Sequence, residues 1–448
     1  MGEGTERPFA DSSVEGCRAR IRERNAALKA ILLELEHPQR DEAASPEAPL
    51  AGVPYVLKDT WDTAGIKTTG GSWRHRARVP SESSHAHAAL SRAGAVLLGK
   101  SNMCDLAFSA ESDNHMFGPV RNPHDETRTA GGSTGGGAAA VADGMAAFDW
   151  GTDFGGSIRA PAAFCGVVGL RLSHATWPVG IQHFPRIAPF FWDMCGMGPL
   201  TRDVAGARAV THAVSAALRA GTEHVQMDAD RVVIYAPDKL HEGEWTTFAA
   251  DAKQLLASAG VSSESTRDLP TPTQVTALFT EYLAAHFKEF IAGDELPLRK
   301  ALPAVLLGLA SGGRLDKRIH PNTALLLAAT AAASLRYRNR DRAARTLGSL
   351  RHDVSRIWDR GALIVSPTCT VRPPKHGRTA WAYHLASFCK LGNLTDSTCL
   401  ALPFGRFRVG GAPPMPRSLQ ILGPPGSENA VLALAARLER VARSPDHS

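Results

Sequence analysis

This sequence has no apolar run long enough to cross a membrane. Its longest runs, at 301–310 and 324–335, are well short of the roughly 20 residues that span a bilayer. The opening residues, MGEGTERPFADSS, contain no basic stretch followed by an apolar segment, so no secretory signal is evident. We therefore expect a cytoplasmic protein without a membrane span.

Cysteine is scarce, and its spacing is irregular. The chain has 7 cysteines among 448 residues, and none of them forms a CxxC pair. An odd number of scattered cysteines is typical of reduced thiols and argues against both a disulfide framework and a zinc site. We interpret the cysteines as core residues and expect neither a metal nor a cofactor.

A strong excess of positive charge is also missing. The net charge is +6, and the one denser arginine patch, RYRNRDRAARTLGSLR at 336–351, is interrupted by Asp341. Its spacing is typical of the solvated face of a helix. From this evidence we expect no nucleic-acid binding.

Apolar strands alternate with helical segments along the chain. With 44% hydrophobic residues, the chain can bury one large core or two ordinary ones, and no repeat or low-complexity linker divides it. The alternation predicts an α/β layer structure. The segment 240–360 is mostly helical in pattern, and we expect it to cap the sheet. Predicted helices cover 13–36, the first part of 85–102, and 135–143; predicted strands cover 49–59, 95–98, 145–150, 232–238, 362–368 and 418–424.

A glycine cluster, TAGGSTGGGAAAV at 129–141, is the most unusual stretch. A phosphate-binding P-loop would need a lysine after the glycines, and none follows. The letters of Gly131–Gly135 match the GxSxG turn that presents a catalytic serine, but the polar segment before them, RNPHDETRTA, predicts no strand to deliver it. Taken alone, the cluster is most simply a loop that enters a helix.

A second glycine-flanked serine is the better candidate nucleophile. In GTDFGGSIRAPAAFCGVVGL at 151–170, a predicted strand leads into a turn where Gly155 and Gly156 precede Ser157. Glycines allow backbone N–H groups to point at one place, which is how a developing oxyanion is held. The histidines offer no clear base. Lys58 ends an apolar strand, where a desolvated amine can lose its proton near neutral pH, although a solvated strand-end lysine is the alternative interpretation.

Taken together, these motifs resemble the amidase signature family. Lys58 in GVPYVLKD, Ser133 in GGSTGG and Ser157 in GTDFGGSIRAPAAFCGVVGL occur in the order and approximate separations of that family. Further segments at 99–123, 192–207 and 419–439 resemble its other landmarks. The resemblance implies a single domain over 1–448, with helices on both faces of a mixed central sheet, and 240–360 as a variable segment that caps the substrate site.

The resemblance also implies roles for individual residues. Ser157 matches the nucleophile, Ser133 the bridging serine and Lys58 the base of a Ser–cisSer–Lys triad. The backbone N–H groups around Phe154, Gly155 and Gly156 match the oxyanion hole.

Residues beside the nucleophile are expected to support it. Thr152, Asp153 and Arg159 would hold the loop by hydrogen bonds and an ion pair, with a surface arginine as the alternative for Arg159. By motif position, Met103 and Trp192 are candidate walls of an acyl pocket, with ordinary core packing as the alternative for each. Asp149 and Trp150 stand where small apolar residues are frequent in the family.

These features favour a free-standing amidase. It would hydrolyse a small carboxamide with an apolar or aryl acyl group, through an acyl-serine, to a carboxylate and ammonia or an amine. The alternative is the glutaminase subunit of a tRNA-dependent amidotransferase, which works with a partner. A non-catalytic relative is disfavoured because all three triad positions are filled. We expect a small-molecule amide as the partner and no nucleic acid, with the oligomeric state open to a homodimer.

Overall fold

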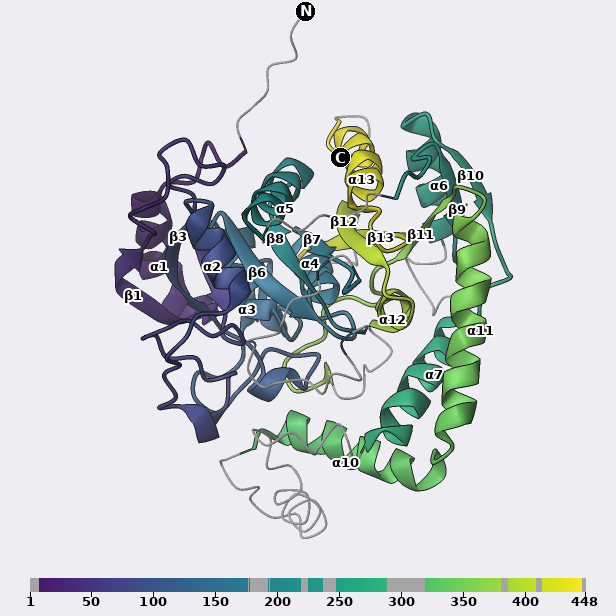
Figure 1. Cartoon of the computed structure of the whole chain (residues 1–448), viewed down its shortest axis with the longest axis horizontal. Coiled ribbons are helices and arrows are strands. Elements are labelled where there is room, and N and C mark those ends of the chain that lie inside the picture. Colours follow the sequence, from purple (N-terminus) through teal and green to yellow (C-terminus); the bar gives the residue numbers. More distant parts are fainter. Residues whose placement is uncertain are drawn as a thin grey trace, which may run out of the picture.

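Helices cover both faces of one large mixed sheet (Figure 1). The computed structural model describes residues 8–175, 177, 192, 194–218, 225–236, 247–287, 319–379, 386–407 and 413–444. The expected α/β class is confirmed. The 11-stranded sheet has the order β1 (Ile31–Gln39), β3 (Val96–Ser101), β2 (Pro54–Lys58), β6 (Phe148–Asp153), β8 (Gly196–Thr201), β7 (Val168–Arg171), β12 (Thr398–Phe407), β13 (Met415–Gly423), β11 (Leu363–Pro367), β9 (Arg231–Ile234) and β10 (Ser262–Ser265).

The register of the strands β3, β2 and β6 places the candidate site. These three strands are parallel, with Lys58 opposite Ser101 and Val56 opposite Asp149. The carboxyl ends of parallel strands meet at one edge of a sheet. Lys58 and Asp153, each the last residue of its strand, therefore lie at the same edge.

Three apolar clusters hold the layers together. On one face, α2 (His85–Arg92), α5 (Val204–Leu218), α6 (Phe248–Ser258) and α13 (Glu428–Ala442) pack on the sheet. On the other, α1 (Val14–Leu28), α3 (Gly135–Asp143) and α4 (Arg159–Cys165) bury a second cluster. A third joins α7 (Pro272–Ala285), α11 (Arg340–Trp358) and α12 (Ser387–Leu394), and Figure 1 shows α7 beside the long α11. Two short helices (Trp73–His75 and Asp105–Ala107), a two-stranded sheet (Arg121–Asn122 with Asp125–Thr129) and α10 (Pro321–Arg336) complete the described elements.

The predicted opening helix, 13–36, is too long. α1 ends at Leu28 because Lys29 adopts a left-handed conformation, with φ of 54°, and donates its N–H to the Asn25 carbonyl oxygen. The Asn25 side chain then bonds both the N–H and the carbonyl oxygen of Ile31. The chain continues as the edge strand β1.

Two other sequence expectations need adjustment. The strand expected at 145–150 is β6, Phe148–Asp153, so it reaches closer to the Ser157 loop. The segment 240–360 contains helices, as expected, but its described part also adds β10 to the edge of the sheet beside β9. Its role as a cap, and the domain limits 1–448, stay predictions.

Glycines in the cluster at 129–141 let α3 lie close to the sheet. A Cβ on Gly136 would stand 2.2 Å from the Asn102 carbonyl oxygen, and one on Gly137 would stand 2.3 Å from Cγ of Asp149. Side chains at these positions would push the helix off β3 and β6. The glycines therefore serve close packing as well as helix entry.

Candidate active site

Lys58 is fully buried at the end of β2. Its Nζ donates to Ser133 Oγ at 2.7 Å and to Thr152 Oγ1 at 2.8 Å. The alternative of a solvated strand-end lysine is therefore wrong. Burial lowers the pKa of Lys58 to about 8, although nearby Cys104 and Asp149 act to raise it. An amine with this pKa is substantially neutral in mildly alkaline solution and can accept a proton.

Ser133 lies in the turn that precedes α3. The Gly132–Ser133 peptide bond is cis. Ser112 supports this turn, since its hydroxyl donates to the Ser133 carbonyl oxygen at 3.2 Å and accepts from the Gly135 N–H at 2.9 Å. Sequence reasoning did not single out Ser112.

Ser157 lies in the loop between β6 and α4, where its side chain is partly exposed. Its carbonyl oxygen accepts the Thr134 N–H at 3.1 Å, so the loops that carry the two serines are bonded to each other. The structure thus joins Lys58 to Ser133 by a side-chain bond, and the Ser133 turn to the Ser157 loop through the backbone.

Asp153 organises the Ser157 loop. Its carboxylate accepts the N–H of Gly156 at 2.8 Å and the N–H of Ile158 at 3.1 Å. The Arg159 guanidinium makes an ion pair with it at 2.9 Å, and both side chains are fully buried. The alternative of a surface arginine is therefore wrong. Burial acts to raise the pKa of Asp153, but Arg159 outweighs it and holds that pKa well below its usual range.

Two residues distant in sequence complete this network. Asn393 Nδ2 donates to Asp153 Oδ1 at 2.9 Å, and Asn393 Oδ1 accepts from Arg159 at 2.7 Å. Gln420 Oε1 accepts a second Arg159 N–H at 3.0 Å. Neither residue was predicted from the sequence. Every charged group of the Asp153–Arg159 pair thus has a buried polar partner.

The loop N–H groups differ in their surroundings. The Gly156 N–H is directed at Asp153, so in this structure it points to the carboxylate rather than to a substrate. A Cβ on Gly156 would stand 2.8 Å from Cβ of Cys389, and one on Gly155 would stand 3.4 Å from the Phe279 ring. The loop is therefore closely covered by α12 and α7. The oxyanion-hole assignment of Phe154, Gly155 and Gly156 stays a prediction.

Met103 and Trp192 are the two residues predicted to form walls of the acyl pocket. Met103 is fully buried, and its carbonyl oxygen accepts from Asn114 at 2.8 Å. Trp192 is partly buried, with its ring centroid 6.0 Å from that of His174. Neither observation assigns these residues to substrate, so their role stays a prediction.

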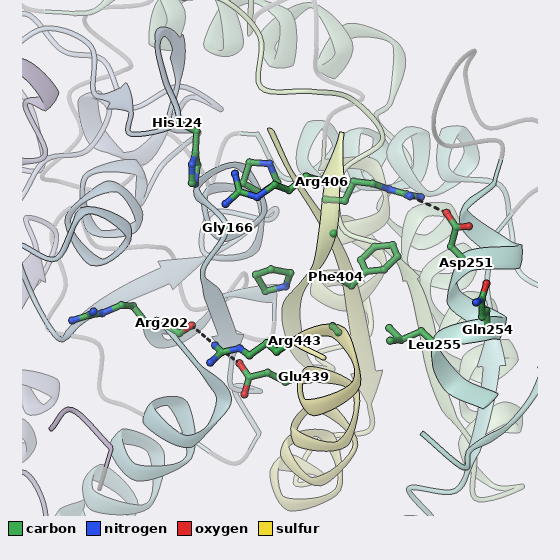
Figure 2. Close-up of a pocket in the computed structure, with 15 residues that line it drawn as sticks. His124, Gly166, Arg202, Asp251, Gln254, Leu255, Phe404, Arg406, Glu439 and Arg443 are labelled. Atoms are coloured by element: carbon green, nitrogen blue, oxygen red, sulfur yellow. Dashed lines mark hydrogen bonds and ion pairs between the residues drawn. The ribbon is translucent and has the colours of Figure 1, made fainter. Parts of the chain in front are cut away.

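A cavity of about 930 Å³ lies away from this site (Figure 2). It is lined by Arg202, which follows Thr201 at the end of β8. In the β6–β8 pairing, Thr201 is opposite Phe148, while Asp153 is opposite Gly196. The cavity is therefore at the other end of the sheet from the Ser157 loop. Two of its arginines bond to groups that also line the cavity: Arg443 donates to Glu439 and to the Arg202 carbonyl oxygen, and Arg417 donates to Asp251.

Comparison with known proteins identifies the family. The family model described as Amidase matches residues 14–432. The chain belongs to the amidase signature family. This membership supports an amide C–N hydrolase and confirms the family inferred from the sequence.

Individual members of the amidase signature family extend the comparison. The chain is 30% identical to the A subunit of the glutamyl-tRNA(Gln) amidotransferase of Moorella thermoacetica, over 88% of this chain and 83% of the relative. Its fold is similar to that of the A subunit of the glutamyl-tRNA(Gln) amidotransferase from Thermotoga maritima, with a TM-score of 0.76, 22% identity, and coverage of 99% and 93%. A crystal structure described as an amidase gives a TM-score of 0.72 with 26% identity and covers 95% of each chain.

These relatives correct one prediction. From the modest net charge of +6, the sequence predicts no nucleic-acid partner. That expectation is wrong, because the curated relative is named as a subunit of an enzyme of glutamyl-tRNA(Gln). Composition averages over the whole surface and says little about the assembly in which a subunit works.

Three remaining observations concern partners and location. No described helix is both long and apolar enough to cross a membrane. In the described part of the chain, no group of three His, Cys, Asp or Glu residues could hold a metal ion. All seven cysteines are free and buried, which agrees with their interpretation as core residues. The cytoplasmic location stays a prediction.

Proposed function

We propose that this protein cleaves an amide C–N bond through an acyl-enzyme on Ser157. The observation that carries the proposal is the 2.7 Å hydrogen bond from the buried Lys58 amine to Ser133 Oγ, on a turn bonded to the Ser157 loop. Burial lowers the pKa of Lys58 to about 8, so its neutral form is accessible near physiological pH. A serine hydroxyl needs such a base to attack an amide.

The proposed reaction transfers a proton from Ser157 through Ser133 to Lys58, and then returns a proton to the leaving nitrogen. Ser157 Oγ bonds to the amide carbon while its proton passes to Ser133 Oγ, and the Ser133 proton passes to Lys58 Nζ. When the C–N bond breaks, the relay returns a proton to the leaving nitrogen. Water then attacks the acyl-serine by the same route, releasing the carboxylate and restoring Ser157.

Backbone N–H groups of the Ser157 loop would stabilise the oxyanion of each tetrahedral intermediate. The Asp153–Arg159 network supports this role because it fixes the loop through side chains from α4, α12 and β13. Thr152 would orient the amine of Lys58 toward Ser133, since its Oγ1 accepts a second Lys58 N–H.

For the substrate, we propose glutamine, with the chain acting as the glutamine-hydrolysing subunit of a tRNA-dependent amidotransferase. The support is a curated relative that is 30% identical over most of both chains and carries that enzyme's name. The proposal replaces our first preference, a free-standing amidase for apolar or aryl amides.

A second candidate keeps the same chemistry without a partner. It is a free-standing amidase that acts on a small carboxamide. The supporting observation is the solved amidase that is 26% identical over 95% of each chain.

Ammonia release distinguishes the two candidates. The protein would be affinity-purified with its co-purifying proteins, and also alone after a stringent wash. Both samples would be assayed on glutamine and on a panel of small carboxamides, with Ser157→Ala as the control. Glutamine hydrolysis that depends on a co-purified protein is expected. Carboxamide turnover by the chain alone, without glutamine hydrolysis, would favour the second candidate. Turnover by Ser157→Ala equal to that of wild type would contradict both candidates.

A further inference from the structure

Asp149 lies on the same face of the sheet as Lys58. It is the register partner of Val56 in β2, and Val56 and Lys58, two residues apart, point to the same face. Asp149 is fully buried. The Ser101 hydroxyl, from the strand on the other side of β2, donates to Asp149 Oδ1 at 2.7 Å. This bond crosses the face of β2 from which Lys58 projects.

The second carboxyl oxygen of Asp149 is poorly suited to carry a charge. Among the described residues, Oδ2 has no hydrogen-bond partner. It faces Gly137 of α3, where a Cβ would stand 2.3 Å from it. Burying a charged oxygen that has no hydrogen-bond donor costs much free energy, whereas burying the neutral, protonated carboxyl group costs much less. Accordingly, burial raises the pKa of Asp149 to about 7, against the opposing effects of Ser101, Lys58 and Lys100.

We propose that Asp149 and Lys58 form a coupled acid–base pair, in which the proton on the Asp149 carboxyl group decides whether Lys58 is a neutral amine. This inference rests on the proposed role of Lys58 as the base. Asp149 is a positioning residue, because it acts through Lys58 and does not touch the reacting atoms.

The coupling follows from the two protonation states of Asp149. When Asp149 is ionised, its negative charge stabilises the ammonium form of Lys58, which cannot accept a proton. When Asp149 is protonated, this opposing charge is removed, and burial, the largest influence on Lys58, favours the neutral amine more strongly. With one proton between them, the pair exchanges between an active form and an inactive zwitterion.

The other titratable groups around the pair are fixed by their own surroundings. Cys104 and Cys195 face Lys58, but burial raises the pKa of each thiol to about 12, so both are neutral. The Asp153 charge is balanced by Arg159. Lys100 also acts on Asp149, but it pairs with Leu57 and therefore projects from the opposite face of the sheet. There it is bonded to Trp61, Thr63 and Thr68, and Asp59 and Asp62 also act on it. Asp149 is thus the carboxyl group poised to change its charge beside Lys58.

The test uses the full-length chain and needs no known substrate. The rate at which a fluorophosphonate probe labels Ser157 would be measured against pH for wild type and Asp149→Asn. The wild-type rate is expected to rise over a broad range, because two coupled groups titrate. In Asp149→Asn the rise should narrow to a single titration, with its midpoint lower by at least roughly half a pH unit. An unchanged midpoint and width would overturn the proposal.

Asp105→Asn provides the matched control. Asp105 is also buried, with its pKa raised chiefly by burial, and it accepts the His320 N–H rather than contacting the pair. Its substitution should leave the midpoint where wild type has it. A midpoint that moves equally in Asp105→Asn would show a general effect of losing a buried acid and would count against the proposal.

Two further measurements keep the proposal testable. If Asp149→Asn does not fold, Ser101→Ala removes the donor that favours ionised Asp149, and the midpoint of the labelling rate should again move to lower pH.

Infrared spectra of wild type should show a carboxylic acid band that titrates between roughly pH 6 and 9. Its absence would overturn the pair, whereas its presence in a protein that the probe never labels would count against the proposed function instead.

Discussion

At the scale of single residues, the proposed mechanism depends on Lys58, because burial lowers the pKa of its amine to about 8 and makes the neutral form accessible near physiological pH. In the sequence, Lys58 ends an apolar strand, which makes it a candidate base but leaves a solvated lysine as the alternative; its role as the base is implied by the family resemblance. The role of its partner Ser133 was also implied by the resemblance, because the glycine cluster alone predicts only a loop that enters a helix. Asn393 and Gln420 could not be predicted, because each is more than 200 residues from Arg159 in sequence and only the folded sheet brings them together.

Replacing Lys58 tests the base directly. Lys58→Ala should lower amide turnover by roughly 10²-fold or more, since general-base catalysis contributes about that much. Part of the loss should be recovered at high pH, where hydroxide replaces the missing base. Turnover measured from pH 7 to 10 checks this, and a variant that matches wild type at pH 7 would contradict the role of Lys58.

At the scale of elements, the loop between β6 and α4 is held from outside by α12 and β13. The motif GTDFGGSIR identifies the loop, but its letters do not show which distant elements hold it. The local sequence was sufficient to predict the ends of α3, because those ends depend on residues that are adjacent in the sequence. The local sequence was not sufficient at Lys29, where a left-handed residue stops α1 and the apolar pattern runs on into β1.

Asn393→Ala tests whether α12 holds the loop. The variant loses the amide that bonds both Asp153 and Arg159, leaving buried charges less well satisfied. We expect a loss of roughly 1–3 kcal/mol in unfolding free energy, together with slower labelling of Ser157. Chemical denaturation and the labelling rate measure the two effects.

Asn339→Ala is the control for stability alone. Asn339 caps α11 by accepting the Arg342 N–H at 2.9 Å, and it lies in an exposed part of the chain. Its loss should cost about 1 kcal/mol without changing the labelling rate. If both variants slow labelling equally, α12 has no special role in holding the loop.

At the scale of the whole molecule, the sequence predicted the α/β class and the family, because both depend on patterns spread over the chain. It gave the amidotransferase subunit only as the alternative to a free-standing amidase, and the net charge of +6 could not decide between the two, because net charge carries no information on assembly. Buried ionisable groups are a further property of the whole fold. Lys58 and Lys100 have pKa values lowered to about 8, and Lys390 to about 7, chiefly by burial.

These lysines predict how stability depends on pH. Between the lowered pKa values and the ordinary value of 10.5, the unfolded chain binds more protons than the folded one, so stability rises with pH. Burial raises the pKa of five thiols above the ordinary value of 9.0, those of Cys17, Cys104, Cys165, Cys195 and Cys399. These thiols outnumber the three lysines, so they reverse the rise in stability above pH 9. We expect maximal stability near about pH 9. Urea denaturation from pH 7 to 10.5 measures this, and a steady fall over that range would show that the lysines are not buried as described.

The most direct measurement for the whole account is the site of covalent attack. The protein would be treated with a fluorophosphonate probe, digested, and mapped by mass spectrometry, with Ser157→Ala treated in parallel. The account predicts one adduct on Ser157 that is missing from the variant, together with loss of amide hydrolysis in that variant. An enzyme that hydrolyses amides while its label lies on another residue, or while Ser157→Ala stays fully active, would contradict it.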